Sequence, residues 1–365
     1  MTKFDVEFWT DGKGFPGRTA PLAQQLEADG WDGIVVADSQ NLTGDPYVAL
    51  AMAAAATTRL KLGTGVTNPL TRHPAATATA IATINEESGG RAVLGIGRGD
   101  SALAHIGLAP ATVGAFTHYL ERVQGYLSGA DVPFEIDLDG RNAPSADTLA
   151  MADAPKQSRL RWLKYASQPK VPVHAVASGP RVISAAALVA DGLIFAVGAS
   201  TTRLSWAVDL ARQTREEAGL DPDELLIGAM VPIAAHAEAE RARNLVAPTL
   251  GSYVRFSVMH GTVTGPVTQG QRESMTNVHR AYDMNTHARR GPQTDQVTDE
   301  VLETFAICGS PQYCIDRLGA LHELGVTKFL LHRGESVNLK EPDPQAREQS
   351  YQNLVTTVMP ALHTT

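Results

Sequence analysis

The sequence is poor in several features that mark particular classes of protein. It has two cysteines, Cys308 and Cys314, in 365 residues, too few for a disulfide framework, and their spacing is not that of a metal site. The most apolar stretch, YVALAMAAAATT, is too short to cross a bilayer. These absences argue against a disulfide-stabilised scaffold, a zinc module and a membrane-spanning protein.

Charge is also sparse and not concentrated. Charged residues make up 19% of the chain, the formal net charge is −8, and the basic residues form no run. We therefore expect no binding to nucleic acid or to an anionic membrane surface. The N-terminal residues MTKFDVEFWTDG lack the apolar core of a signal peptide, so a cytoplasmic location is expected.

What the sequence does contain is an alternation of short apolar segments with segments of helical spacing. Each apolar segment precedes a helical pattern, and eight such strands are the number that closes a parallel barrel. No G-x-G-x-x-G pattern follows the first strand, which disfavours an open dinucleotide-binding sheet. The predicted fold is an α/β protein of the (β/α)8 TIM-barrel type. The predicted strands are 3–9, 33–38, 60–66, 91–97, 171–177, 193–197, 225–235 and 326–332.

Two polar stretches, at about 129–170 and 261–298, interrupt the alternation. Connections of this length in a compact fold are usually functional or disordered. Active sites of TIM barrels lie where the strands end and the loops begin. The prediction is a single domain over residues 1–365, with two irregular insertions over the C-terminal mouth that cover the substrate.

Carboxylates occur at or near three of the predicted strand ends. Glu7 lies inside the first apolar segment, Asp38 ends the second, and Asp100 follows the fourth. Glu7 and Asp100 either face outward in a charge network or point into the mouth, where burial would raise their pKa values and suit them to proton transfer. Asp38 is either a turn-capping residue or a polar anchor in the pocket.

Glycines and a helix start also mark the predicted mouth. Gly97 and Gly99 follow the fourth strand, which indicates close approach of the backbone to a flat or anionic ligand; no G-K-[ST] follows, so this is not a P-loop. Ser178–Arg181 begins a helix whose free N–H groups suit a phosphate, although an ordinary serine N-cap is the alternative. Gly198 and Ser200, after the sixth strand, are available to the same anion.

These strand ends together resemble a known family. The runs GTGVTNP at 63–69, RHP at 72–74, SGGRAVLGIGRGD at 88–100 and VASGPR at 176–181 are similar to those of the luciferase-like superfamily of (β/α)8 barrels. Within it they most resemble the methylenetetrahydromethanopterin-reductase-like branch, whose cofactor is the deazaflavin F420. The resemblance covers most of the chain outside the two insertions.

The resemblance implies a role for each matching residue. The Gly65–Val66 bond would be a non-prolyl cis peptide behind the cofactor ring, and the segment around Ser178 would hold the cofactor phosphate. Relatives often have His after the aspartate that matches Asp38, whereas this chain has Ser39. The catalytic residues implied are Glu7, Asp38 and Asp100, and the cofactor-binding residues implied are Gly65, Val66, Thr67, Asn68, Gly97, Gly99, Ala177, Ser178, Gly179, Pro180, Arg181 and Gly198.

The function implied by the resemblance is an F420-dependent oxidoreductase that transfers a hydride to or from a small organic substrate. One alternative is an FMN-dependent monooxygenase that uses O2 and is supplied by a separate flavin reductase. Another is a barrel that binds a flavin without catalysis. The expected partners are a small-molecule substrate and a separate flavin or F420 reductase, the family implies a homodimer, and no metal is expected.

Overall fold

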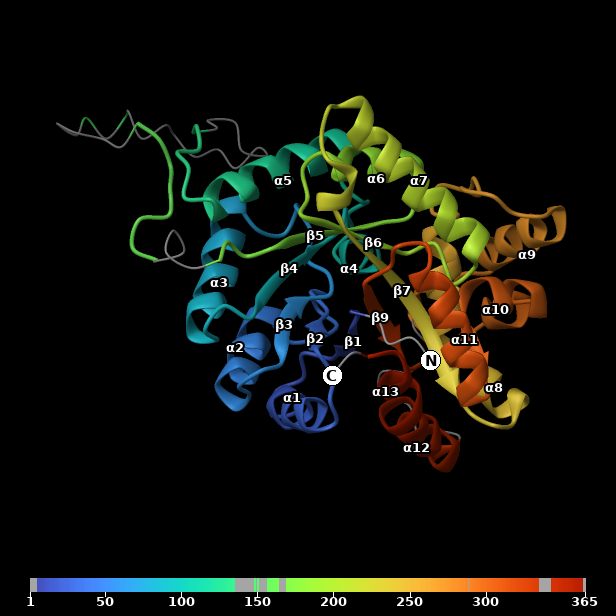
Figure 1. Cartoon of the computed structure of the whole chain (residues 1–365). Coiled ribbons are helices and arrows are strands. Elements are labelled where there is room, and N and C mark those ends of the chain that lie inside the picture. The colour runs from blue at the N-terminus through green and yellow to red at the C-terminus, as the bar shows by residue number, and fades with distance from the viewer. Residues whose placement is uncertain are drawn as a thin grey trace.

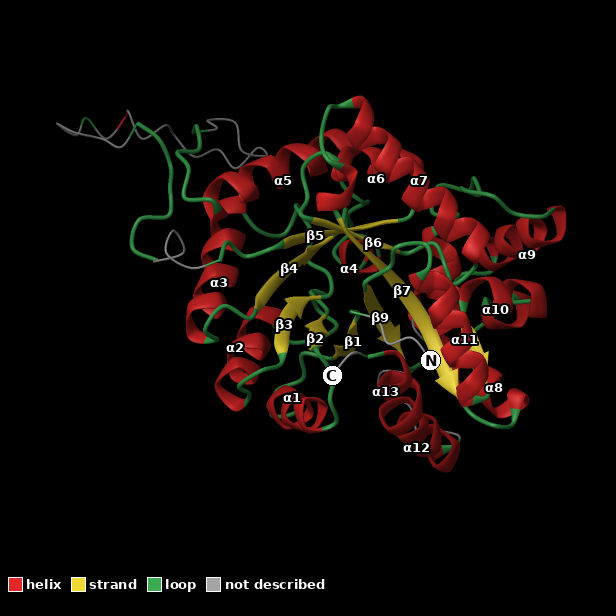
Figure 2. Cartoon of the chain, viewed as in Figure 1, coloured by secondary structure: helices red, strands yellow, loops and turns green. Residues whose placement is uncertain are grey.

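The fold is that of a computed structural model, which describes residues 5–134, 148, 150, 156–163, 169–287, 289–334 and 343–363. Eight parallel strands close into a barrel in the order β1-β2-β3-β4-β5-β6-β7-β9, with β9 paired to both β7 and β1. Helices surround this barrel, as Figures 1 and 2 show. The predicted (β/α)8 barrel is confirmed.

The strands are short and, except at their ends, buried. A ninth strand, β8, was not predicted; it pairs with the end of β7 and lies outside the closed barrel. The strands are β1 (Glu7–Gly12), β2 (Gly33–Val36), β3 (Lys61–Thr64), β4 (Ala92–Ile96), β5 (Val173–Ala177), β6 (Gly192–Phe195), β7 (Leu226–Ala235), β8 (Ile307–Gly309) and β9 (Lys328–His332).

Several helices begin where local chemistry favours a start. Asp45, Thr112 and Ser310 accept hydrogen bonds from the first-turn N–H groups of α2, α5 and α11, as N-cap residues do. No helix in the described ranges is long and apolar enough to span a membrane. The α-helices are α1 (Thr19–Ala28), α2 (Pro46–Ala56), α3 (Pro74–Glu87), α4 (Ser101–Ala104), α5 (Val113–Leu127), α6 (Pro180–Ala187), α7 (Thr201–Glu217), α8 (Ala239–Phe256), α9 (Gln269–Arg280), α10 (Asp299–Phe305), α11 (Pro311–His322), α12 (Pro344–Asn353) and α13 (Met359–Leu362). The 3-10 turns are η3 (Pro222–Glu224), η4 (Met284–Thr286) and η5 (Thr294–Gln296), and η6 (Leu354–Val358) is a π-helical turn.

The second predicted insertion, 261–298, is more regular than expected. It contains α9, which begins with a capping box between Thr268 and Gln271 and buries Met275 and Val278. A capping box satisfies two backbone N–H groups at once, and this stabilises a helix whose sequence is otherwise polar. Of the first insertion, residues 135–147, 149, 151–155 and 164–168 lie outside the described residues.

The barrel interior is filled by alternate residues of the strands. Trp9 is fully buried there, and a Cβ added to Gly33 would lie 2.4 Å from its indole ring. The indole therefore needs a glycine on the neighbouring strand. Trp9 and the apolar side chains around it form a compact cluster, which consists of Trp9, Val35, Val93, Ile194, Ala196, Met230 and Leu330.

The sequence left two positions open for Glu7, and the structure shows the charge network rather than the mouth, against the catalytic role that the resemblance implied. Glu7 is the first residue of β1 and is in register with Lys328, the first residue of β9, so it lies at the N-terminal floor. Its carboxylate pairs with Lys61 and accepts a hydrogen bond of 2.7 Å from Trp9 Nε1. The strand runs on to Gly12, because Glu7, Trp9 and Asp11 continue the two-residue alternation.

Lys328 is the most deeply buried charged group of this floor, with an exposed fraction of 3%. Its Nζ lies 3.3 Å from the centroid of the Trp9 ring and 3.3 Å from His174 Nδ1. Burial lowers the pKa of Lys328 to about 7, against the attraction of Glu7 and with added repulsion from Lys61. Burial and the neighbouring Lys328 also hold the pKa of His174 well below its usual value.

We expect Lys328 to make stability rise with pH. Between about pH 7 and 10.5 the unfolded chain keeps a proton on this lysine that the folded chain has lost, so the free energy of unfolding increases as pH rises. The slope from one such group is at most about 1.4 kcal/mol per pH unit. Urea unfolding of the wild type and of Lys328→Met between pH 7 and 9.5 should show this difference in slope.

The control for that measurement is Lys156→Met, which removes the same charge from an exposed position. Lys328→Met should flatten the pH dependence and should be at least as stable as the wild type at pH 7, because an apolar side chain of similar volume replaces a buried amine whose charged form burial disfavours. Parallel curves for all three proteins would contradict the assignment.

Candidate active site

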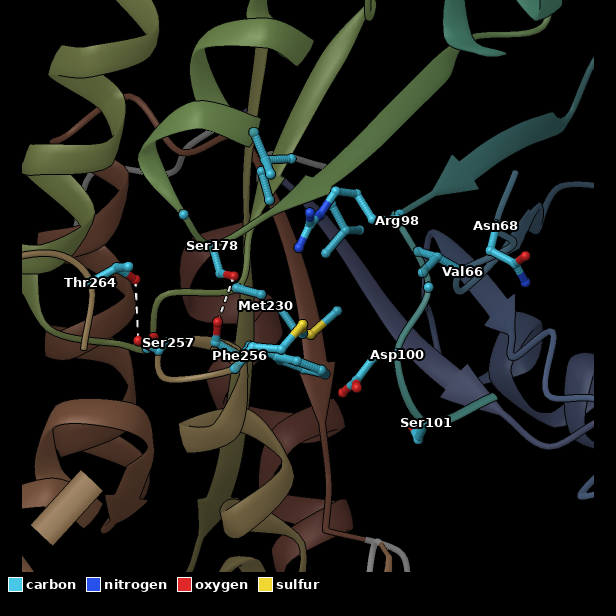
Figure 3. Close-up of a pocket in the computed structure, with 18 of the residues that line it drawn as sticks. Val66, Asn68, Arg98, Asp100, Ser101, Ser178, Met230, Phe256, Ser257 and Thr264 are labelled. Atoms are coloured by element: carbon cyan, nitrogen blue, oxygen red, sulfur yellow. Dashed lines mark hydrogen bonds between the residues drawn. The ribbon is translucent and has the colours of Figure 1, made fainter. Parts of the chain in front are cut away.

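A cavity of about 520 Å³ lies at the C-terminal ends of the strands. Its walls come from the segments that follow β2, β3, β4 and β5, from the start of α6 and from the end of α8. Figure 3 shows its two sides, with Ser178, Met230 and Phe256 facing Val66, Asn68 and Asp100 across the space. The lining residues are Ala37, Asp38, Ser39, Val66, Asn68, Gly97, Arg98, Gly99, Asp100, Ser101, Ala102, Val113, Val176, Ala177, Ser178, Gly179, Pro180, Arg181, Val182, Ala196, Met230, Phe256, Ser257, Met259, His260, Thr262 and Thr264.

One wall is built by the chain beyond β3. The Gly65–Val66 peptide bond is cis, as the family resemblance predicted, and Val66 and Asn68 line the cavity. The segment pairs with the end of β4: Thr67 N–H donates to Gly95 O over 3.0 Å, and Gly97 N–H donates to Thr67 O over 3.0 Å. Two strand extensions therefore hold this wall in place.

The opposite wall contains the start of α6. Gly179 is the N-cap residue, Pro180 is the first helical residue, and Ser178 Oγ donates to the carbonyl of Phe256 over 2.8 Å. A Cβ added to Gly179 would meet nothing within 4 Å. Because the helix N–H groups and this open space face one cavity, the geometry suits an anionic group.

Asp38 lines the cavity and is buried. Its Oδ2 accepts a hydrogen bond of 2.7 Å from Thr67 Oγ1, and its Oδ1 accepts one of 2.5 Å from Gln40 Nε2. Burial raises the pKa of Asp38, and the hydrogen bond from Thr67 and the charge of Arg72 oppose this shift only in part. Asp38 is thus held rigidly and keeps a proton more readily than an exposed aspartate.

Asp100 lines the cavity on the side where β4 ends. Its carboxylate pairs with Arg255 Nη1 at 2.7 Å, and the Arg255 guanidinium lies 4.9 Å from the Tyr282 ring centroid. Burial raises the pKa of Asp100, and Arg255 offsets part of that shift. Since Arg255 comes from α8 and Tyr282 follows α9, the second insertion supports this carboxylate.

Asp11 is the carboxylate that stands at the true C-terminal end of β1. It pairs with Lys13 at 2.7 Å and with His332 Nδ1 at 3.1 Å. Burial opposes its ionisation, but Lys13 and His332 outweigh burial and hold the pKa of Asp11 well below its usual value. The two-residue alternation from Glu7 through Trp9, followed by the glycine-rich turn at 12–14, was the signal that could have located Asp11.

Most of the predicted site residues come together at this cavity, and the remainder lie elsewhere. Gly65 and Thr67 lie behind the wall. Gly198 does not line the cavity: a Cβ added there would lie 2.7 Å from the carbonyl oxygen of Thr304. Glu7 lies at the floor. Met230, Phe256 and His260 line the cavity but were not predicted, because only the folded chain brings β7 and the end of α8 to this place.

The closed parallel barrel and its mouth cavity define a (β/α)8 barrel of the kind that serves as an enzyme scaffold. A model of the luciferase-like monooxygenase family matches residues 2–328, and the chain belongs to this family. The family expected from the motifs is therefore confirmed.

Individual relatives are similar to this chain over most or about half of its length. The chain is 28% identical over 322 residues to a 5,10-methylenetetrahydromethanopterin reductase of Methanolobus tindarius, covering 86% of this chain and 89% of the relative. It is 31% identical over 192 residues to an F420-dependent glucose-6-phosphate dehydrogenase of Kineococcus radiotolerans, covering 50% of this chain and 53% of the relative. The solved coenzyme F420-dependent tetrahydromethanopterin reductase of Methanopyrus kandleri has the same fold, with a TM-score of 0.72, 23% identity and coverage of 98% and 99%.

We expect Arg255→Met to destabilise the fold strongly. The substitution leaves Asp100 buried without its cation, and losing one partner of a buried pair costs about 3–5 kcal/mol. Urea unfolding should show that the double variant Asp100→Asn/Arg255→Met recovers part of the loss. Arg243→Met, on the same helix, is the control: it removes an arginine from more exposed pairs with Asp299 and Glu303 and should cost about 1 kcal/mol or less. Equal losses for Arg255→Met and Arg243→Met would be inconsistent with a buried pair.

Proposed function

We propose that this chain is an F420-dependent oxidoreductase that transfers a hydride to or from a small organic substrate. The observation that carries the proposal is the mouth cavity itself, in which Val66 and Asn68 lie on one wall and the start of α6, with Ser178 and Gly179, on the other. The F420 named for the Kineococcus relative supports the choice of cofactor. A single domain, as expected from the sequence, is part of the proposal.

The residues present fit a deazaflavin. The side of the cavity with Val66, Asn68 and Gly97 combines an apolar side chain, an amide and a glycine, and a Cβ at Gly97 would lie 3.2 Å from Val66 Cγ2 on this side. On the other side, Ala177–Arg181 would receive the phosphate at the start of α6. A bound reduced deazaflavin supplies a hydride from its C5 carbon.

The protein itself contributes orientation, exclusion of water and proton handling. Val66 would press against one face of the ring, and Met230 and Phe256 would limit water on the other side. Asp38 and Asp100, whose pKa values burial raises, are lining carboxyl groups that could give or take a proton during the reaction. Asp11, at the C-terminal end of β1, stays ionised because its pKa is low, and it is hydrogen-bonded to His332.

FMN is the alternative cofactor, and it would make the chain a monooxygenase supplied with reduced flavin by a separate reductase. The same wall and helix start would accommodate it, because its ring and phosphate are alike in shape. The deazaflavin is favoured by the names of the curated relatives described above, and the two cofactors are separable by direct binding.

We further propose that the enzyme is a homodimer formed through α2. This helix contains no charged residue, and its outer face exposes Val48 and Met52 by 66% and 59% together with Ala51 and Ala55. An apolar helix face of this kind would be covered in a dimer. The cytoplasmic location stays an expectation of the sequence.

Binding of F420 should depend on the open space before α6. Gly179 has extended backbone angles that valine also adopts, and a side chain there would occupy that space. We expect Gly179→Val to weaken F420 binding at least about tenfold while thermal unfolding stays within a few degrees of the wild type. Fluorescence titration with F420 and with FMN measures the two affinities, and a thermal unfolding curve measures the stability.

Gly114→Ala is the matched control, because a Cβ at Gly114 also meets nothing within 4 Å but lies on α5, outside the cavity lining. If the wild type binds FMN and does not bind F420, the proposed cofactor is wrong and FMN takes its place. If Gly179→Val binds F420 as the wild type does, the cofactor phosphate does not bind at the start of α6.

The dimer can be tested with charges on α2. We expect Val48→Glu/Met52→Glu to run as a monomer of about 38.8 kDa in light scattering, whereas the wild type has twice that mass, because two carboxylates would be buried against their copies. Leu220→Glu, at another position with an exposed fraction of 39%, should leave the mass unchanged. A monomeric wild type would refute the dimer.

A further inference from the structure

Two arginines and a histidine line the cavity close to one another. Arg98 follows β4, Arg181 is the second residue of α6, and His260 follows α8; all three line the cavity. Arg98 Nη2 lies 3.2 Å from His260 Nε2, and Arg98 Nη1 donates to the carbonyl of Ala111 over 3.1 Å. Figure 3 shows the Arg98 side chain extending into the space between the two walls.

The charges of this cluster are not balanced by the protein. No carboxylate in the described part of the chain forms an ion pair with Arg98 or Arg181. The acid that acts on Arg98 electrostatically is Asp100, which is already paired with Arg255. Burial and the neighbouring Arg181 both lower the pKa of Arg98, so holding these two arginines together without a counter-ion is unfavourable.

Arg181 is a second positive charge in an unfavourable position. It lies in the first turn of α6, where the helix dipole is positive and a cation is disfavoured. A phosphate bound to the N–H groups of this turn would accept from Arg181 as well. That single group does not account for Arg98, which comes from another strand end and faces His260.

We propose that Arg98 and His260 bind a second anionic group of the cofactor, a carboxylate of its acidic side chain, separate from the phosphate bound at the start of α6. This inference rests on the proposed function and extends it. Arginine donates to a carboxylate through two parallel N–H groups, and His260, whose Nε2 accepts from Arg98 Nη2, would hold the guanidinium in place for this contact. The pair thereby discriminates a deazaflavin with an acidic tail from a flavin that carries only one phosphate.

The test is binding of two deazaflavins, one with the acidic tail and one without it. One probe is F420 with its glutamate tail, and the other is the same 8-hydroxy-5-deazaflavin as its simple 5′-phosphate, both followed by fluorescence. We expect the wild type to bind F420 about tenfold more tightly, which is the contribution of a charge-assisted contact. Arg98→Gln should lose that tenfold preference and bind the simple phosphate within about twofold of the wild type.

Two further variants make the outcome specific. Arg98→Lys keeps the charge and should retain part of the preference, and its salt dependence should stay steeper than that of Arg98→Gln. Arg272→Gln is the control, because Arg272 is exposed on α9 and does not line the cavity; it should behave as the wild type does.

The possible failures are distinguishable. If the wild type binds both probes equally, or if Arg98→Gln weakens both to the same extent, the second anion seat is refuted while the proposed cofactor stands. If the wild type binds neither deazaflavin but binds FMN, the proposed function fails, and the inference fails with it.

Discussion

The close approach of the C-terminal ends of strands β3 and β4 is the constraint on which the cavity depends. A Cβ added to Gly95 would lie 2.1 Å from the carbonyl oxygen of Thr64, and Thr64 Oγ1 donates to Gly95 O over 2.6 Å. Only a glycine allows the two strands to come this close. That contact places Val66 in the cavity wall, and Thr67, bonded to Asp38, ties the end of β2 to the same wall.

The two ends of the barrel interior carry charge in different ways. At the floor, Glu7 and Lys328 contact the indole of Trp9, and Lys61 and His174 contact these two residues in turn. At the mouth, acids and bases lie beside open space, so their charges can act on a ligand. The apolar layer around Trp9 lies between the two groups.

Much of the fold was predictable because it depends on local pattern. Strand and helix order follow from apolar periodicity, and most of the predicted lining residues lie at strand ends, which the barrel brings to one edge by its topology. The prediction was wrong at Glu7, because the polar residues Thr10 and Asp11 made β1 look shorter than it is. It also missed α9, whose buried Met275 and Val278 are few among polar neighbours and whose start depends on a capping box.

The sequence by itself determined the barrel through its apolar periodicity and the family through the resemblance of its motifs, and it located Asp38 and Asp100 at strand ends but not Asp11. Only the tertiary structure decided which of those groups act together. Arg98 meets His260, and Asp100 meets Arg255, across more than a hundred residues of chain. Such pairs depend on how α8 and the second insertion pack over the mouth, and no periodicity records that packing.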